Sequence, residues 1–156
     1  MDDALYFEDF QVGQRLTSAP LSMDRDRLVA FAAEFDPQPQ HLGEASAATS
    51  QFGTLVASGW HTAALTMRMQ IDAVFGRIPG GAVGAQVDRL TWRRPVHPGE
   101  RLHAVVEVLA ARESRSRPTQ GVLTLRTTTL DTDGKTVMEM EATVLVPRRP
   151  ANAAPT

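Results

Sequence analysis

Cysteine is absent from the 156-residue sequence, and this absence removes several kinds of chemistry at once. Without thiols the protein has no disulfide bonds and no cysteine nucleophile, and thiolate metal sites are excluded as well. Residues 1–5 are acidic and lack the basic and apolar regions of a secretory signal peptide. We therefore predict a cytoplasmic protein.

Long apolar segments and an excess of one charge are also missing. No run of about eighteen or more apolar residues occurs, so we expect no membrane span. The formal net charge is −2 and Lys135 is the only lysine, so nothing favours general binding to nucleic acid. Hydrophobic residues nevertheless make up 42% of the chain, which is enough for one domain to bury a core.

Apolar residues that recur at helical spacing predict the helices. The first helix covers residues 24–35, with Ser22 as the expected N-terminal cap, and ends before Pro37. Its apolar face consists of Leu28, Phe31, Ala32 and Phe35. Residues 60–75 are apolar around nearly the whole circumference, which indicates a long helix that its surroundings bury. A shorter helix is expected near residues 44–51.

After residue 82 the pattern changes to that of β-strands. Four segments have alternating or β-branched apolar residues, and turn residues separate them at 95–99 and 131–134. These segments are 83–92, 102–109, 122–130 and 137–146. Consecutive strands with short links are naturally antiparallel, and one face of their sheet has to be covered. We predict an α+β protein of the hotdog type, in which an antiparallel β-sheet wraps around the long central α-helix.

This arrangement uses nearly the whole chain as one unit. No internal repeat and no linker divides the sequence, so we place a single domain at residues 1–149. Residues 150–156 are small or polar and contain two prolines, and we expect them to form a flexible C-terminal tail.

Two short motifs contain the residues best suited to chemistry. In the first, Asp36 and His41 lie five residues apart on a stretch that Pro37 and Pro39 keep out of a helix. A carboxylate and an imidazole held together can activate water. In the second, Gly59 stands at the head of the long helix, where N–H groups without internal partners can stabilise an oxyanion. From spacing alone, a structural turn and a plain helix entry remain alternative explanations.

The order of these motifs resembles the MaoC-like dehydratase family, which includes single-hotdog (R)-specific enoyl-CoA hydratases. The resemblance covers roughly residues 6–149. Residues 6–14 are similar to the family's first strand, 95–100 to a loop between strands, and 114–118 to a later loop. The family's aspartate, histidine and helix glycine correspond to Asp36, His41 and Gly59.

The resemblance implies a hydro-lyase that adds water across the C2=C3 bond of a 2-enoyl-CoA to give a 3-hydroxyacyl-CoA. It implies that Asp36 is the general base, that His41 orients the same water, and that the N–H of Gly59 stabilises the thioester oxyanion. We expect no cofactor, because coenzyme A is part of the substrate. The four histidines do not form a metal-ligand pattern, so we predict no metal.

Six further residues are candidates for substrate binding. They are Gln38, Ser58, Trp60, His61, Met67 and Gly84. Gln38 and Ser58 stand where the family often has asparagine and histidine, and both keep hydrogen-bonding capacity. Met67 is placed to reach an acyl tunnel, and Gly84 would let the pantetheine arm pass close to a strand. Helix capping by Ser58 and simple core packing by His61 and Met67 are the structural alternatives.

The expected partner is a second copy of the chain. A single hotdog unit leaves an edge strand and one side of its helix uncovered, and exposed edges pair with other chains. Together with the family's paired units, this predicts a homodimer or a larger homo-oligomer. Two other functions stay open. A hotdog acyl-CoA thioesterase would use the same oxyanion donor, and a subunit of a hetero-oligomeric dehydratase would work beside a different chain.

Overall fold

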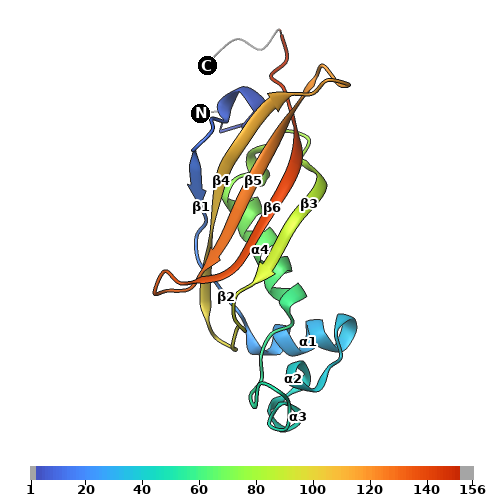
Figure 1. Ribbon diagram of the computed structural model, residues 1–156, viewed down its shortest axis with the longest axis vertical. Helices are drawn as coiled ribbons and strands as arrows, with labels where there is room; N and C mark the ends of the chain where they lie inside the picture. Colours follow the sequence, from blue (N-terminus) through green and yellow to red (C-terminus); the bar gives the residue numbers. More distant parts are fainter. Residues whose placement is uncertain (1–2, 152–156) are drawn as a thin grey trace.

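An antiparallel sheet of six strands curves around one long helix, α4 (Gly59–Ala73), in the computed structural model, which describes residues 3–151. In Figure 1 the long strands cross in front of α4, and the short helices lie beyond the lower end of the sheet. This confirms the predicted α+β hotdog arrangement. Residues 152–156 of the expected C-terminal tail lie outside the described residues.

Four long strands form the body of the sheet, and all four predicted strands are confirmed. They are β3 (Val83–Trp92), β4 (Arg101–Glu113), β5 (Gln120–Leu130) and β6 (Thr136–Pro147). The order across the sheet is β1-β4-β5-β6-β3, so β3 is an edge strand and β5 is central. The short strands β1 (Arg15–Thr17) and β2 (Leu21–Ser22) both pair with β4.

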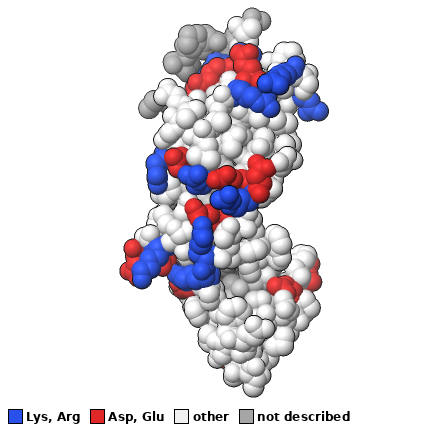
Figure 2. Space-filling view, viewed as in Figure 1, with Lys and Arg blue, Asp and Glu red and all other residues white. Residues whose placement is uncertain are grey.

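Alternation along the central strands separates a buried face from an exposed one. Leu123, Leu125 and Thr127 of β5 are buried against the helix side, as the sequence predicted. On the opposite face Arg126 of β5 pairs with Glu141 of β6 at 3.2 Å. Figure 2 shows basic and acidic side chains lying side by side across the middle of this face, so neither sign of charge dominates it.

The segment from Tyr6 to Gln14 is not the first strand, so that expectation was wrong. It contains a short 3₁₀-helix, η1 (Phe7–Asp9), and the first strand begins only at Arg15. The Asp9 carboxylate accepts the N–H of Tyr6 at 2.8 Å. A side chain that hydrogen-bonds its own local backbone competes with pairing in a sheet, and this explains the difference.

The helices before α4 differ from the predicted ones at their ends. The N-terminal cap of α1 (Arg25–Phe35) is Asp24, whose side chain accepts the N–H of Arg27, while Ser22 belongs to β2. The stretch from Asp36 to His41 was expected to stay out of a helix, but Pro39 opens a further one, α2 (Pro39–Leu42), which contains His41. Proline suits the first helical position because the N–H that it lacks would have no partner there.

The third short helix and the end of the long one also needed correction. Helix α3 (Glu44–Ala47) is shorter than the predicted 44–51. Helix α4 ends at Ala73, and residues 75–77 form the 3₁₀-helix η2 (Phe75–Arg77). None of the helices in residues 3–151 has the length and apolar character that crossing a bilayer requires.

Helix α4 is buried on one face, whereas the sequence predicted burial all round. Trp60 and Met67 are 61% and 45% exposed in the single chain. The buried face is Thr62, Thr66, Met69, Gln70 and Ala73. The sheet curves around one side of the helix only, so the flank of α4 near the edge strand β3 stays open.

The central strand makes a direct test of this core possible. Leu123 is fully buried on β5, so Leu123→Ala should lower the free energy of unfolding by about 2–5 kcal/mol. Val12 is 67% exposed, so Val12→Ala should change the free energy of unfolding by less than about 0.5 kcal/mol. Urea unfolding followed by tryptophan fluorescence measures both. Equal effects of the two substitutions would contradict the described core.

Candidate active site

Asp36 lies at the point where α1 ends and the chain turns toward α2. Its N–H donates to the carbonyl of Ala32 at 2.9 Å, and it is the last residue held by the helix. Pro37 follows and disfavours a helical conformation at Asp36, whose φ and ψ are −151° and 65°. This break turns the carboxylate away from the axis of α1 and toward the head of α4.

His41 sits on α2 and is held by the segment that leads into α4. Its Nδ1 lies 2.7 Å from the carbonyl oxygen of Val56, and the side chain is almost completely buried. A carbonyl can only accept, so Nδ1 carries the hydrogen and Nε2 of the neutral ring is an acceptor. That Nε2 faces Oδ2 of Asp36 at 3.4 Å.

Two donors hold the Asp36 carboxylate in its ionised form. The Ser58 hydroxyl donates to Oδ2 at 2.6 Å, and Nε2 of Gln38 donates to Oδ1 at 2.6 Å. The Ser58 bond is the largest cause that lowers the pKa of Asp36, followed by the Gln38 bond, and together they outweigh the opposing effect of partial burial. Asp36 is therefore a carboxylate at neutral pH and can accept a proton.

The head of α4 presents a backbone donor beside this pair. Ser58 caps the helix by accepting the N–H of Trp60 at 3.3 Å. No described residue accepts the N–H of Gly59, which lies at the positive end of the helix. The indole of Trp92 covers this glycine and donates to its carbonyl at 2.7 Å. A Cβ at residue 59 would lie 2.8 Å from that indole, so the contact requires glycine.

These groups meet in one cleft of about 490 Å³. Asp36, His41 and Gly59 all line it, so the three residues proposed as catalytic from the sequence converge on a shared space. An ionised carboxylate and an acceptor nitrogen can together receive the hydrogens of one water molecule. The free N–H of Gly59 can meet an oxygen that becomes negative.

The six substrate-binding candidates do not all lie in this cleft. Trp60 lines it, and its ring meets Trp92 edge-on at 5.1 Å. Gln38 and Ser58 bond Asp36 instead of lining the space. His61 points toward α1, where its ring stacks on Phe31 with 4.6 Å between centroids.

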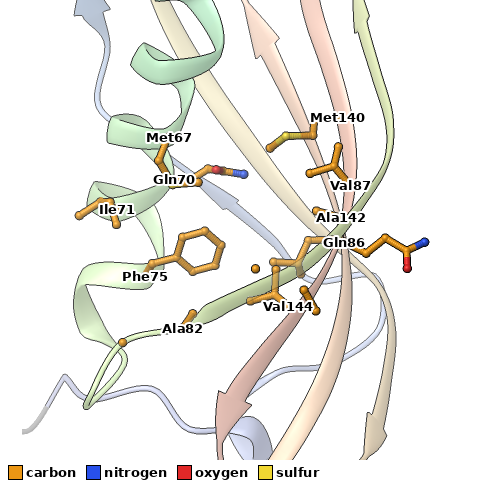
Figure 3. Close-up of a pocket in the computed structure, with 14 residues that line it drawn as sticks. Met67, Gln70, Ile71, Phe75, Ala82, Gln86, Val87, Met140, Ala142 and Val144 are labelled. Carbon is orange, nitrogen blue, oxygen red and sulfur yellow. The ribbon is translucent and has the colours of Figure 1, made fainter. Parts of the chain in front are cut away.

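Met67 and Gly84 line a different pocket of about 470 Å³, farther along α4. Figure 3 shows this pocket between the helix and the sheet, with side chains from α4, β3 and β6 around it. The two pockets share no lining residue. The role of Met67 and Gly84 in substrate binding stays a prediction.

Sequence reasoning missed several residues of the cleft. Trp92 ends β3 and Phe52 lies in the loop before α4, and both rings line the space. No motif marks Trp92, because its contact with Gly59 joins residues 33 positions apart. Arg94 also lines the cleft, but Glu100 and Asp131 bind its guanidinium, each at 2.8 Å. Within residues 3–151, no three histidine or carboxylate side chains gather as a metal site would require.

The sequence is similar to a known protein family and to proteins with assigned activities. A model of the family described as "MaoC like domain" matches residues 9–130. An (R)-specific enoyl-CoA hydratase from Rhodospirillum rubrum is 34% identical over 145 residues, covering 92% of this chain and 93% of that protein. A 3-hydroxybutyryl-CoA dehydratase from Methylorubrum extorquens is 35% identical over 149 residues, covering 93% and 86%.

A solved structure is similar over almost the same length. The crystal structure of a MaoC-like dehydratase from Rhodospirillum rubrum superposes with a TM-score of 0.87. The two sequences are 43% identical, and the match covers 94% of this chain and 99% of the other. The likeness therefore includes the elements that hold the cleft, from α1 to β6.

The hydrogen bond from Ser58 gives a test by pH titration. The pKa of Asp36 is lowered in the folded protein, so its charge stabilises the fold above the ordinary pKa, and this contribution is lost as the pH falls through the lowered value. Ser58→Ala removes the strongest donor. We expect the pKa of Asp36 to rise toward its ordinary value, so the part of the stability that depends on this charge and is lost in acid should become smaller.

Titration of the Asp36 carboxyl carbon by NMR measures this change. Ser46→Ala is the control, because the Ser46 hydroxyl bonds only the carbonyls of Pro39 and Gly43. An Asp36 pKa that is the same in Ser58→Ala and Ser46→Ala would refute the assigned cause.

Proposed function

This chain belongs to the MaoC-like dehydratase family, and we propose that it is a hydro-lyase acting on 2-enoyl-CoA thioesters. It would add water across the C2=C3 bond to give a 3-hydroxyacyl-CoA and would catalyse the reverse dehydration. One observation carries the proposal: Asp36, His41 and the unpartnered N–H of Gly59 line a single cleft. The (R)-specific enoyl-CoA hydratase relative from Rhodospirillum rubrum supports it.

In the proposed reaction Asp36 and His41 hold the attacking water together. Oδ2 of Asp36 and Nε2 of His41 are both acceptors and lie 3.4 Å apart, so one water placed against them donates a hydrogen to each. The water oxygen bonds to C3, and a proton passes to the pair. The C2=C3 electrons move toward the thioester, and the pair returns a proton to C2. Asp36 is assigned as the base.

The negative charge of this step develops on the thioester oxygen. The N–H of Gly59 would donate to that oxygen from the positive end of α4, and one such donor contributes about 10²–10³ in rate. The Trp92 indole packs against Gly59 and donates to its carbonyl, and it leaves no room for a Cβ at this position. The Nδ1 bond of His41 to Val56 keeps Nε2 available for the water.

We also propose a homodimer that forms on the open edge of β3. Val83 and Val87 of this edge strand are 56% and 58% exposed, and Trp60 and Met67 are exposed on the neighbouring flank of α4. Apolar side chains along an unpaired edge favour pairing with another chain. We propose, separately, that the protein is located in the cytoplasm.

Asp36→Asn tests the general base. The amide has nearly the same shape but cannot take the proton, so hydration of crotonyl-CoA should fall by about 10²-fold or more. Loss of the conjugated-thioester absorbance measures the rate. The Asp26 side chain is 90% exposed at the start of α1, and Asp26→Asn should keep the parental rate.

Release of free coenzyme A in the same reactions distinguishes a hydratase from the alternative, an acyl-CoA thioesterase. A hydratase leaves the thioester intact, so a disulfide dye should detect no free coenzyme A while the absorbance falls. Release of coenzyme A at the rate of absorbance loss would favour thioester hydrolysis. An Asp36→Asn rate within a few-fold of the parent would contradict the assignment of the base.

Light scattering tests the proposed dimer. At micromolar concentration the mass should be at least twice the 17.0 kDa of the chain. Val83→Arg should lower it to that of one chain, because a charge would have to be buried in an apolar contact. Val12 is similarly exposed on another part of the surface, and Val12→Arg should keep the larger mass. A single-chain mass for the unaltered protein would refute the proposal.

A further inference from the structure

The pocket between α4 and β3 contains one buried polar group that the proposed reaction does not use. The Gln70 side chain is 3% exposed and points from α4 into the space that Figure 3 shows. Its Nε2 donates to the Thr127 hydroxyl of β5 at 2.5 Å, but its Oε1 is buried without a hydrogen-bond partner among the described residues. A buried amide oxygen of this kind is disfavoured unless something supplies a donor.

The surroundings of Gln70 are otherwise suited to a hydrocarbon chain. The apolar side chains of the pocket include Met67, Ile71, Phe75, Leu125, Met140 and Val144. Gln86 is the other amide of the lining, but it donates to Asp88 and in Figure 3 extends away from Gln70. The space of about 470 Å³ therefore offers an apolar wall with a single polar point, and its Met67 and Val87 also belong to the surface on which we propose the dimer, so a second copy would border the pocket.

The pocket and the catalytic cleft lie along the same gap between α4 and β3. Trp60, Met67 and Ile71 recur at positions that share one flank of a helix, with Trp60 in the cleft and the other two in the pocket. On β3, Trp92 lines the cleft and Val87 lines the pocket. The two spaces are therefore bordered by the same flank of α4 and by the same strand, with Gln70 beside the second one.

The separation of the two sites along α4 sets the size of a ligand that would reach both. Gln70 follows Gly59 by eleven positions on α4, which corresponds to about 16 Å along the helix axis. An acyl chain whose thioester oxygen meets the N–H of Gly59 must be long to reach Gln70. A short chain such as crotonyl would end well before the pocket.

We propose that this pocket binds the far part of a long acyl chain that carries a hydroxyl group, and that the hydroxyl pairs with the Gln70 carboxamide. The inference rests on the proposed function, since the chain is that of the thioester substrate. A hydroxyl both donates and accepts, so it satisfies either end of an amide. A plain hydrocarbon leaves Gln70 unpaired, and a carboxylate would lose its hydration against apolar walls.

Paired substrates test the inference by activity. The measurement is kcat/KM for two 2-enoyl-CoA thioesters of equal length, one with and one without a hydroxyl group near the far end. The unaltered protein should prefer the hydroxylated chain by about tenfold, which is the rate equivalent of one retained hydrogen bond. Gln70→Met keeps the length of the side chain and should abolish or reverse the preference. Gln11→Met, at an exposed residue that lines neither the cleft nor the pocket, is the control and should keep the preference.

Calorimetry with free fatty acids tests the inference without catalysis. The hydroxylated acid should bind the unaltered protein more tightly than the plain acid of equal length. This comparison does not depend on the folding of any variant. Equal binding of the two acids, or binding of neither, would overturn the inference and leave Gln70 to an ordered water molecule.

Two further outcomes separate this inference from the other proposals. If crotonyl-CoA is hydrated but the hydroxyl group brings no preference, the pocket proposal fails and the proposed function stands. If no enoyl-CoA is hydrated, the proposed function fails, and calorimetry alone decides what the pocket binds. If Gln70→Met changes the mass in light scattering but not the chain preference, the carboxamide pairs with a second copy, which also overturns the inference.

Discussion

The hydroxyl group of Ser58 joins the two halves of the candidate active site. It donates to Oδ2 of Asp36 and accepts the N–H of Trp60 in the first turn of α4. The same atom therefore fixes the carboxylate in its ionised form and caps the helix whose head supplies the oxyanion donor. The carboxylate at the end of α1 is thus linked directly to the first turn of α4.

Backbone hydrogen bonds around Ser58 keep this junction in place. The N–H of Val56 donates to the carbonyl of Gln40 on α2, and the N–H of Ala57 donates to the carbonyl of Val96 in the loop after β3. The segment before α4 thus connects the helix that bears His41 with the end of the sheet. These bonds fix the position of Val56, whose carbonyl accepts the Nδ1–H of His41. The imidazole is therefore oriented by the backbone of this segment.

Sequence predicted the residues of the site better than the surroundings that hold them. Asp36 and His41 are close in the chain, and Gly59 follows from the start of a helix, but spacing alone left a turn and a plain helix entry open. The resemblance to the family joined the three residues into one site. Trp92 could not be found in this way, because its contact with Gly59 depends on the curvature of β3 around the head of α4. The prediction of the first strand at residues 6–14 was wrong because the Asp9 carboxylate accepts the N–H of Tyr6, and the periodicity of the sequence does not reveal this local hydrogen bond.

The buried face of α4 shows why the pattern of apolar residues was not enough. Thr66 bonds Thr129 at 2.7 Å and Gln70 bonds Thr127 at 2.5 Å, so two polar pairs join the helix to the central strand. Apolar packing tolerates small rotations and shifts, whereas a buried hydrogen bond is lost if its partners separate. These pairs therefore fix the rotation of α4 about its axis. That rotation decides which flank faces β3, and with it which side chains line the gap between the cleft and the second pocket.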